Sequence, residues 1–176
     1  PNFHTPPTTT TSTTLLHTPP PSAATNVALT DTALTAWNAK FATNSCRPVT
    51  AIRAAYTDVN ANTTAYPSLP PLLGTPPFPT YISGHSTFSG AGAAVLKSFF
   101  GRDTIAFTLA SEDATVPSRS FTSFSQAAQE AGLTRIYVAI HFPFDNVDGL
   151  PAGADIGNQS AGKYSLARDP PPTAAP

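Results

Sequence analysis

Residues 79–101 constrain the fold of this chain more than any other stretch. They form a proline-bounded loop followed by a run of small and apolar residues that ends in a glycine. This pattern predicts a helix over residues 86–100. Ser83, Gly84 and His85 would then lie at the helix N-terminus, where free backbone N–H groups and the helix dipole favour an anion.

Each residue at this helix start has a property that suits a binding site. Gly84 lets the backbone approach a ligand closely. Ser83 supplies a hydroxyl group, and His85 can exchange a proton near neutral pH. The same three residues also suit an ordinary helix cap, so the stretch by itself does not identify a site.

The charge content excludes some classes of partner. Charged residues make up 11% of the 176 residues and the net charge is -1, whereas charged residues are about a quarter of average proteins. No basic run is present, which argues against a nucleic-acid partner. No apolar run reaches the ~18 residues that a membrane span needs. Cys46 is the single cysteine, so an intramolecular disulfide is excluded.

The prolines indicate the domain boundaries. The chain has 20 prolines, concentrated towards its ends. We predict a Thr/Pro-rich linker or stalk at residues 1–30, one folded domain at 31–168 and a Pro-rich tail at 169–176. Asn62 and Asn158 begin Asn-x-Ser/Thr sequons and are glycosylation candidates. Together these features predict an extracellular or secreted glycoprotein.

Hydrophobic periodicity predicts a mainly α fold of the helical-bundle type. The predicted helices are 33–44, 49–56, 86–100, 121–131, 133–140 and 149–165. A long irregular loop is predicted at residues 57–82, and residues 105–109 suit a short strand or an extended loop. Because the loops take up much of the domain, the bundle is expected to be incomplete. The further helices would be missing from this chain or supplied by a second copy or a partner chain.

Several residues are predicted to set the packing of these helices. Leu34, Trp37 and Phe41 recur at helical spacing in the first helix and are predicted to face the core. The small residues near Gly90 in the third helix would allow close helix packing. Gly132 is predicted to stop the fourth helix.

Three separated clusters carry the candidate chemistry: Lys40 with Arg47, the helix start at residues 83–85, and Arg135 with His141 and Asp145. Each has an ordinary interpretation when taken alone. A lysine on a helix is usually solvated, an arginine in an apolar segment can form a structural ion pair, and a single histidine is more often structural than catalytic. Together they favour a pocket for an oxyanion, because arginine binds such oxygens through two parallel hydrogen bonds.

The three clusters, Lys-x6-Arg-Pro, Ser-Gly-His and Arg-x5-His-x3-Asp, resemble the three-part motif of the vanadium-dependent haloperoxidase and type-2 phosphatidic acid phosphatase superfamily. The match spans residues 40–145 in the same order. Ile82 stands where many members have proline, and Thr134 where a serine often precedes the arginine. Phe78 resembles the aromatic residue of chloroperoxidase-like members.

The resemblance implies a role for each residue of the motif. The equatorial oxygens of the oxyanion would be bound by Lys40, Arg47, Ser83, Gly84 and Arg135. His141 would coordinate vanadium or, in a phosphatase, become a phosphohistidine. Asp145 would orient His141, and His85 would act as the general acid–base.

The implied function is that of a vanadate-dependent haloperoxidase, which uses peroxide to oxidise a halide to hypohalous acid, with vanadate as cofactor. The alternative within the superfamily is a phosphatase that acts on phosphate esters without a cofactor. An alternative of another class is a non-catalytic structural domain of an extracellular Pro-rich protein. A metal hydrolase is disfavoured, because three cations aimed at one place would repel a divalent metal ion.

Overall fold

The computed structural model describes residues 21–113 and 115–164. This part of the chain is mainly α-helical, as predicted. Its elements are α1 (Pro21–Thr43), α2 (Pro48–Arg53), a 3-10 turn (Ala55–Thr57), α3 (Gly84–Phe100), β1 (Phe107–Leu109), β2 (Arg119–Phe121), α4 (Phe124–Tyr137) and α5 (Pro143–Tyr164). The Thr/Pro-rich residues 1–20 and the predicted Pro-rich tail at 169–176 lie outside the described residues.

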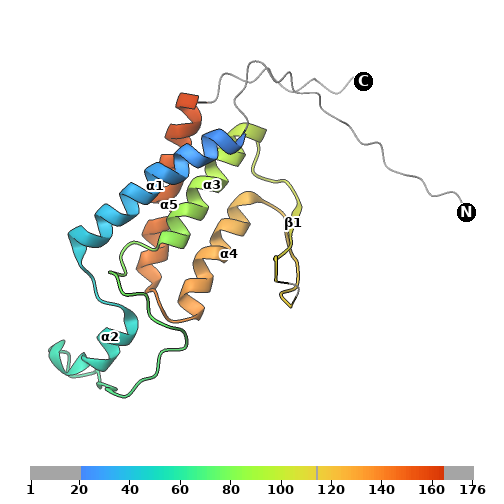
Figure 1. Ribbon diagram of the computed structural model, residues 1–176. Helices are drawn as coiled ribbons and strands as arrows, with labels where there is room; N and C mark the ends of the chain where they lie inside the picture. Colours follow the sequence, from blue (N-terminus) through green and yellow to red (C-terminus); the bar gives the residue numbers. More distant parts are fainter. Residues whose placement is uncertain (1–20, 114, 165–176) are drawn as a thin grey trace, which may run out of the picture.

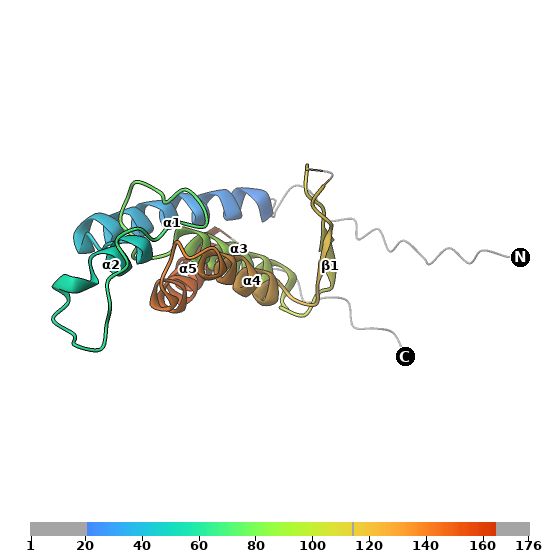
Figure 2. The ribbon, with the colours of Figure 1, turned by 90° about the horizontal axis from the view of Figure 1, so that it is seen from below.

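Helix α3 lies at the centre of the helical body and packs against α1, α4 and α5 (Figure 1). Viewed from below, α1 lies over the row formed by α3, α4 and α5 (Figure 2). Strands β1 and β2 pair antiparallel, with Phe107 opposite Phe121. The irregular segment predicted at 57–82 leads to the start of α3. In the described ranges, no helix combines the length and the hydropathy that a bilayer span requires.

Helix α1 starts earlier than predicted and buries a different face. It begins at Pro21, so residues 21–30 belong to the helix and not to an irregular linker. Leu34, Trp37 and Phe41 are 63%, 42% and 67% exposed, so the prediction that they face the core is wrong. The buried face consists of residues four apart, namely Ala24, Ala28, Thr32, Ala36 and Lys40. Apart from Lys40, these side chains are small and allow α1 to pack directly on α3. Small residues give a weak hydropathy signal.

A row of glycines sets the distance between α3 and α5. A Cβ atom at Gly153 would lie 1.9 Å from the carbonyl oxygen of Thr87, and one at Gly157 would lie 2.4 Å from that of Ala91. Only glycine therefore permits this close approach. The packing brings the start of α5 against the loop before α3, where the N–H of Ser83 donates to the carbonyl of Asp145 at 3.1 Å.

Helix α4 continues through Gly132, so the prediction that this glycine stops the helix is wrong. Gly132 instead makes a close contact with α5: a Cβ atom there would lie 2.0 Å from Oδ1 of Asn146, so this side chain would have to move. The helix ends at Tyr137, and residues 133–140 are not a separate helix. In the turn that follows, the carbonyl of Arg135 accepts from the N–H of His141 at 3.3 Å, which carries His141 back beside the helix end.

Candidate functional site

A cavity of about 480 Å³ lies between the last turn of α1, the start of α3 and the end of α4. Its polar lining includes six residues predicted from the sequence: Lys40, Arg47, Gly84, His85, Arg135 and His141. Aromatic side chains of Trp37, Phe78 and Phe88 form part of the rest. The structure therefore brings together residues from all three sequence clusters.

Lys40 holds the loop that precedes α3. Its ammonium group is buried and donates to the carbonyl oxygens of Pro79 at 3.1 Å, Thr80 at 2.9 Å and Ile82 at 2.7 Å. Burial, with a smaller contribution from the charge of Arg47, lowers the pKa of Lys40 to about 8. Lys40 is therefore a cation at neutral pH, placed on the cavity wall by its position on the buried face of α1.

Arg47 connects the same loop to His141. It precedes α2 and donates through Nε to the carbonyl of Phe78 at 3.0 Å, and through Nη1 to the carbonyl of Ile140 at 2.8 Å. Nη1 also lies 3.1 Å from Nε2 of His141. The guanidinium carbon is 4.9 Å from the centroid of the Phe78 ring, in cation–π geometry.

His141 has its two ring nitrogens in different environments. Nδ1 lies 2.8 Å from Oδ2 of Asp145, whereas Nε2 faces Nη1 of Arg47. An arginine can only donate, so Nε2 is the acceptor and Nδ1 carries the proton. Burial lowers the pKa of His141, and the hydrogen bond to Asp145 acts in the opposite direction. The result is a neutral imidazole with its Nε2 lone pair next to a guanidinium.

Asp145 lies behind His141, fully buried at the start of α5. Burial acts to raise the pKa of Asp145, but hydrogen bonds outweigh it and the net pKa is lowered. Three donors converge on Oδ2: Nδ1 of His141, Oγ1 of Thr80 at 2.5 Å and the N–H of Phe142 at 3.0 Å. Asp145 is therefore an ionised acceptor that fixes the orientation of the imidazole.

His85 and Arg135 complete the polar wall of the cavity. His85 is exposed at the edge of the cavity. Partial burial lowers the pKa of His85, as do the charge of Arg135 and the neighbouring imidazole of His141. The guanidinium of Arg135 is half-buried, and its Nε donates to Oγ1 of Thr134 at 3.0 Å.

Ser83 is placed differently from the other predicted residues. Its buried side chain is the N-cap of α3 and accepts from the N–H of Ser86 at 3.3 Å and from its hydroxyl at 2.9 Å. It is not among the residues that line the cavity. Its predicted contact with an oxyanion stays a prediction, while Gly84, the first residue of α3, does line the cavity.

Thr80 was not singled out by the sequence, although its hydroxyl contacts both His141 and Asp145. A threonine in an irregular loop carries no periodicity or spacing that could have revealed this contact. Trp37 was predicted to be a core residue, and it lies instead at the cavity, 5.0 Å from the ring of Phe78 between centroids.

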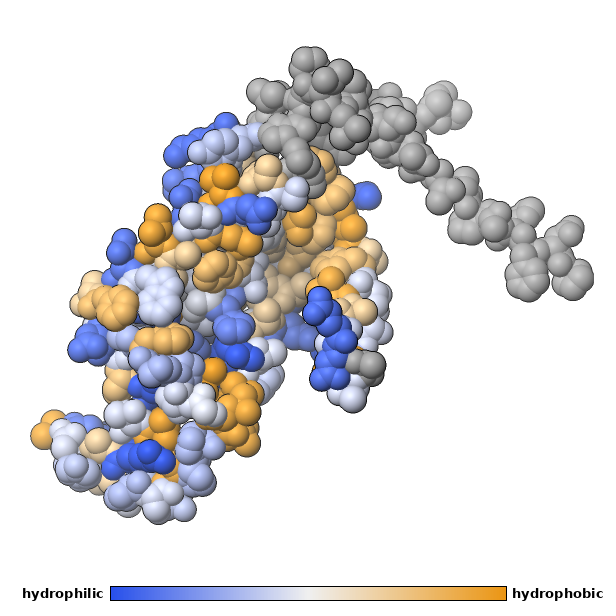
Figure 3. Space-filling view, viewed as in Figure 1, coloured by the Kyte–Doolittle hydropathy of each residue, from blue (hydrophilic) through white to orange (hydrophobic). Residues whose placement is uncertain are grey.

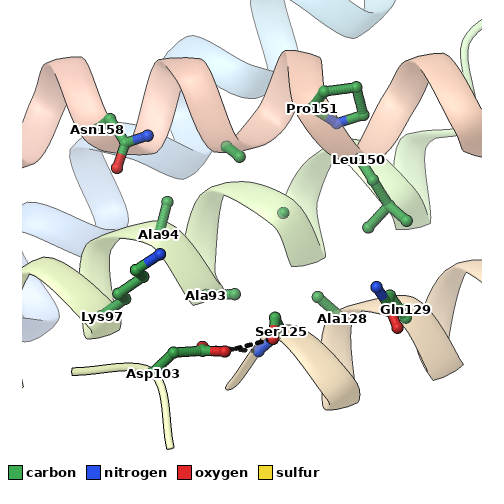
Figure 4. Close-up of a pocket in the computed structure, with 12 residues that line it drawn as sticks. Ala93, Ala94, Lys97, Asp103, Ser125, Ala128, Gln129, Leu150, Pro151 and Asn158 are labelled. Atoms are coloured by element: carbon green, nitrogen blue, oxygen red, sulfur yellow. Dashed lines mark hydrogen bonds between the residues drawn. The ribbon is translucent and has the colours of Figure 1, made fainter. Parts of the chain in front are cut away.

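A second hollow of about 260 Å³ lies between α3, α4 and α5, away from the predicted site (Figure 4). Its lining is mostly alanine and other small or apolar residues, and Asp103 at one end is hydrogen-bonded to Ser125. Asn158, one of the two glycosylation candidates, lines this hollow from α5. Asn62, the other candidate, lies in an exposed turn.

The chemistry of the main cavity fits an oxyanion. Within residues 21–113 and 115–164, no three His, Cys, Asp or Glu side chains gather in a way that could hold a metal cation. The cavity instead offers guanidinium and ammonium donors, a helix N-terminus and an imidazole lone pair. These groups suit the oxygens and the central atom of vanadate or phosphate.

Comparison with known proteins agrees with this chemistry. The family model of the VCPO second helical-bundle domain matches residues 22–169. The structure of a bacterial vanadium-dependent iodoperoxidase is 36% identical, with a TM-score of 0.70, over 85% of this chain and 34% of that chain. No match is found among curated proteins.

Two further structures, the apo and holo forms of a bacterial vanadium-dependent chloroperoxidase, share the fold. Both are 18% identical over 80% of this chain, with TM-scores of 0.64 and 0.63, and the match covers 36% and 35% of their chains. This chain therefore spans about a third of the length of these solved relatives. Because the family model covers most of the chain and every residue around the cavity, the chain belongs to the VCPO second helical-bundle family, within the vanadium haloperoxidase and type-2 phosphatidic acid phosphatase superfamily.

Proposed function

We propose that this chain carries the vanadate site of a vanadium-dependent haloperoxidase. The observation that supports the proposal is the continuous chain of contacts from Arg47 through His141 to Asp145, at 3.1 and 2.8 Å. In this arrangement, Nε2 of His141 is unprotonated and lies next to the guanidinium of Arg47. Both residues line a cavity large enough for a small oxyanion. A structural ion pair would not need an unprotonated ring nitrogen on the wall of a cavity.

The overall reaction would be X⁻ + H₂O₂ + H⁺ → HOX + H₂O, in which the halide is oxidised by two electrons and the peroxide is reduced. Bound vanadate would supply Lewis-acid activation of the peroxide. Arg47, Arg135 and the N–H of Gly84 would donate to the oxyanion oxygens, and the charge of Lys40, whose three protons go to loop carbonyls, would attract them. Nε2 of His141 would bind the central atom, and Asp145 would hold the proton on Nδ1.

His85 would move the proton that the reaction requires. Its lowered pKa leaves the imidazole neutral near pH 7, so it can accept a proton from bound peroxide. Its position at the exposed edge of the cavity would let it return that proton to solvent or to the product. The cationic groups around it disfavour a lasting imidazolium.

The test compares halide oxidation with ester hydrolysis on the same folded protein. We expect halogenation of a phenol dye with vanadate and peroxide, with iodide as the first halide because a 36% identical relative is an iodoperoxidase. His141→Ala should abolish the activity, and Arg102→Ala, exposed and outside the cavity, should not. Hydrolysis of a phosphate ester without halogenation would favour the phosphatase. Neither activity in a protein with intact helices would favour the structural domain.

We also propose that the protein is exported, on the basis of its Thr/Pro-rich composition and sequons. Asn62 is the better candidate for glycosylation because it is exposed in a turn, whereas Asn158 lies in α5 and the Ser160 of its sequon is buried. Mass spectrometry of the protein from a secreting eukaryotic host should find a glycan on Asn62 and none on Asn158. Unmodified Asn62 in such a host would contradict the proposal.

A further inference from the structure

Thr80 lies at the point where the loop before α3 meets the His141–Asp145 pair. The residue is fully buried. Its Oγ1 lies 2.5 Å from Oδ2 of Asp145 and 3.1 Å from Nδ1 of His141. A hydroxyl has a single proton, and an ionised carboxylate can only accept, so this proton goes to Asp145. The Nδ1–H of His141 then has two acceptors, Oδ2 and the lone pair of Oγ1.

The carboxylate of Asp145 is bound on one side only. Its Oδ2 accepts from Thr80, His141 and the N–H of Phe142. Its Oδ1 is buried and has no hydrogen-bond partner in the described part of the chain. Because all three donors act on Oδ2, a partial rotation of the carboxylate would weaken these three hydrogen bonds together. The Thr80 hydroxyl is a side-chain donor that opposes this rotation.

Hydrogen bonds to two other segments of the chain hold the backbone of Thr80. Its N–H donates to the carbonyl of Ser45 at 3.0 Å, and its carbonyl accepts from Nζ of Lys40 at 2.9 Å. These bonds do not involve the hydroxyl, so a side-chain substitution can test the hydroxyl alone. They also mean that the hydroxyl is presented from a fixed backbone.

We propose that Thr80 is a positioning residue, whose hydroxyl holds the Asp145 carboxylate so that Nδ1 of His141 keeps its proton and Nε2 stays unprotonated. The consequence for oxyanion binding rests on the proposed function. The protonation of Nδ1 of His141 does not rest on that function, because it follows from the hydrogen bonds alone.

The test uses Thr80→Val, which keeps the shape of the side chain and removes the hydroxyl. Thr80→Ser restores the hydroxyl. Thr32→Val is the matched control, because Thr32 is also fully buried and its hydroxyl donates at 2.7 Å to Ala28 in α1, outside the site. Long-range ¹H–¹⁵N spectra of the labelled proteins report which ring nitrogen of His141 is protonated, and a titration with orthovanadate measures binding.

We expect a single Nδ1–H tautomer at His141 in the wild type, Thr80→Ser and Thr32→Val. We expect a second tautomer in Thr80→Val, with vanadate binding about tenfold weaker or more. An unchanged tautomer in Thr80→Val would overturn the proposal whatever the binding shows. If Thr80→Val does not fold, Thr80→Ala gives the same comparison. A wild type that binds no vanadate would overturn the proposed function, and the tautomers would still decide the role of Thr80.

Discussion

Among single residues, Lys40 both holds a loop and faces the cavity with its charge. Raising the pH has opposite effects on its contribution to stability and on its attraction for an anion. Its three carbonyl partners hold the loop, and its charge faces the cavity. Because burial lowers its pKa from 10.5 to about 8, the unfolded chain binds more protons than the folded chain between these two values. Lys40 therefore makes the free energy of unfolding rise with pH in this window.

We predict that oxyanion affinity falls over the same window in which this contribution to stability rises. The charge of Lys40 is lost as pH increases above about 8, and a bound anion moves this loss to somewhat higher pH. Vanadate or phosphate titrations and urea unfolding at several pH values would measure both trends. Lys97→Met, an exposed lysine of α3, should leave both trends unchanged. Affinity that stays constant to pH 10.5 would show that Lys40 does not bind the anion.

Arg135 differs from Arg47 in how its guanidinium is held. Arg47 is fixed by the carbonyls of Phe78 and Ile140, whereas the Nε of Arg135 donates to the adjacent residue Thr134. The guanidinium of Arg135 can therefore bind an oxyanion without breaking a contact between distant parts of the chain.

We predict that Arg135→Ala weakens binding of vanadate or phosphate by about 10- to 100-fold, the range for losing a charged hydrogen bond. The free energy of unfolding should change by less than about 1 kcal/mol. Calorimetric titration and urea unfolding would measure the two effects. Arg102→Ala should change neither, and wild-type affinity in Arg135→Ala would remove Arg135 from the site.

At the scale of secondary-structure elements, the contact between α3 and α5 places the site. The glycine row of α5 lets this helix approach the backbone of α3, and Asp145 lies at the start of the same helix. A displacement of α5 would therefore move Asp145 away from Thr80 and His141.

We predict that Gly153→Ala is strongly destabilising, because the new Cβ would lie 1.9 Å from the carbonyl of Thr87. The expected loss is about 1–3 kcal/mol or more. Gly162→Ala is the matched control in the same helix, since a Cβ there meets no atom within 4 Å, and it should be neutral or stabilise by up to about 1 kcal/mol. Urea unfolding checks both, and equal stabilities would contradict the close packing.

For the molecule as a whole, the site is built from residues of most of the helices and of the segments between them. Its cations come from α1, the residue before α2, and α4, while His141 lies in the turn between α4 and α5. Apolar residues also reach the surface at several places on the face seen in Figure 3. The site therefore depends on segments that are distant in the sequence and that a shared ligand would hold together.

We predict that orthovanadate stabilises the folded protein by about 2.7 kcal/mol when its concentration is 100 times the dissociation constant. The melting temperature should rise in the wild type and rise much less in Arg135→Ala. Differential scanning fluorimetry at increasing vanadate concentration measures the shift. An equal shift in both proteins would show that vanadate binds somewhere other than this cavity.

The mainly α class, the helix start at residues 83–85 and the three clusters of the site could all be predicted from the sequence. Each of these depends on residues close together in the chain, such as the Ser83 cap or the spacing from His141 to Asp145. The turn after α4 was also predictable in outline, because Arg135 and His141 could converge only if the chain reversed there.

The folded structure was needed to find which face of α1 is buried, what Gly132 does and which residue supports Asp145. The buried face of α1 is made of alanine and threonine with Lys40, so its hydropathy does not distinguish it from the exposed face that carries Leu34 and Phe41. Gly132 could be a helix stop or a close contact, and the approach of Asn146 decides between them. The hydroxyl of Thr80 reaches residues more than sixty positions away, and no local pattern in the sequence records such a contact.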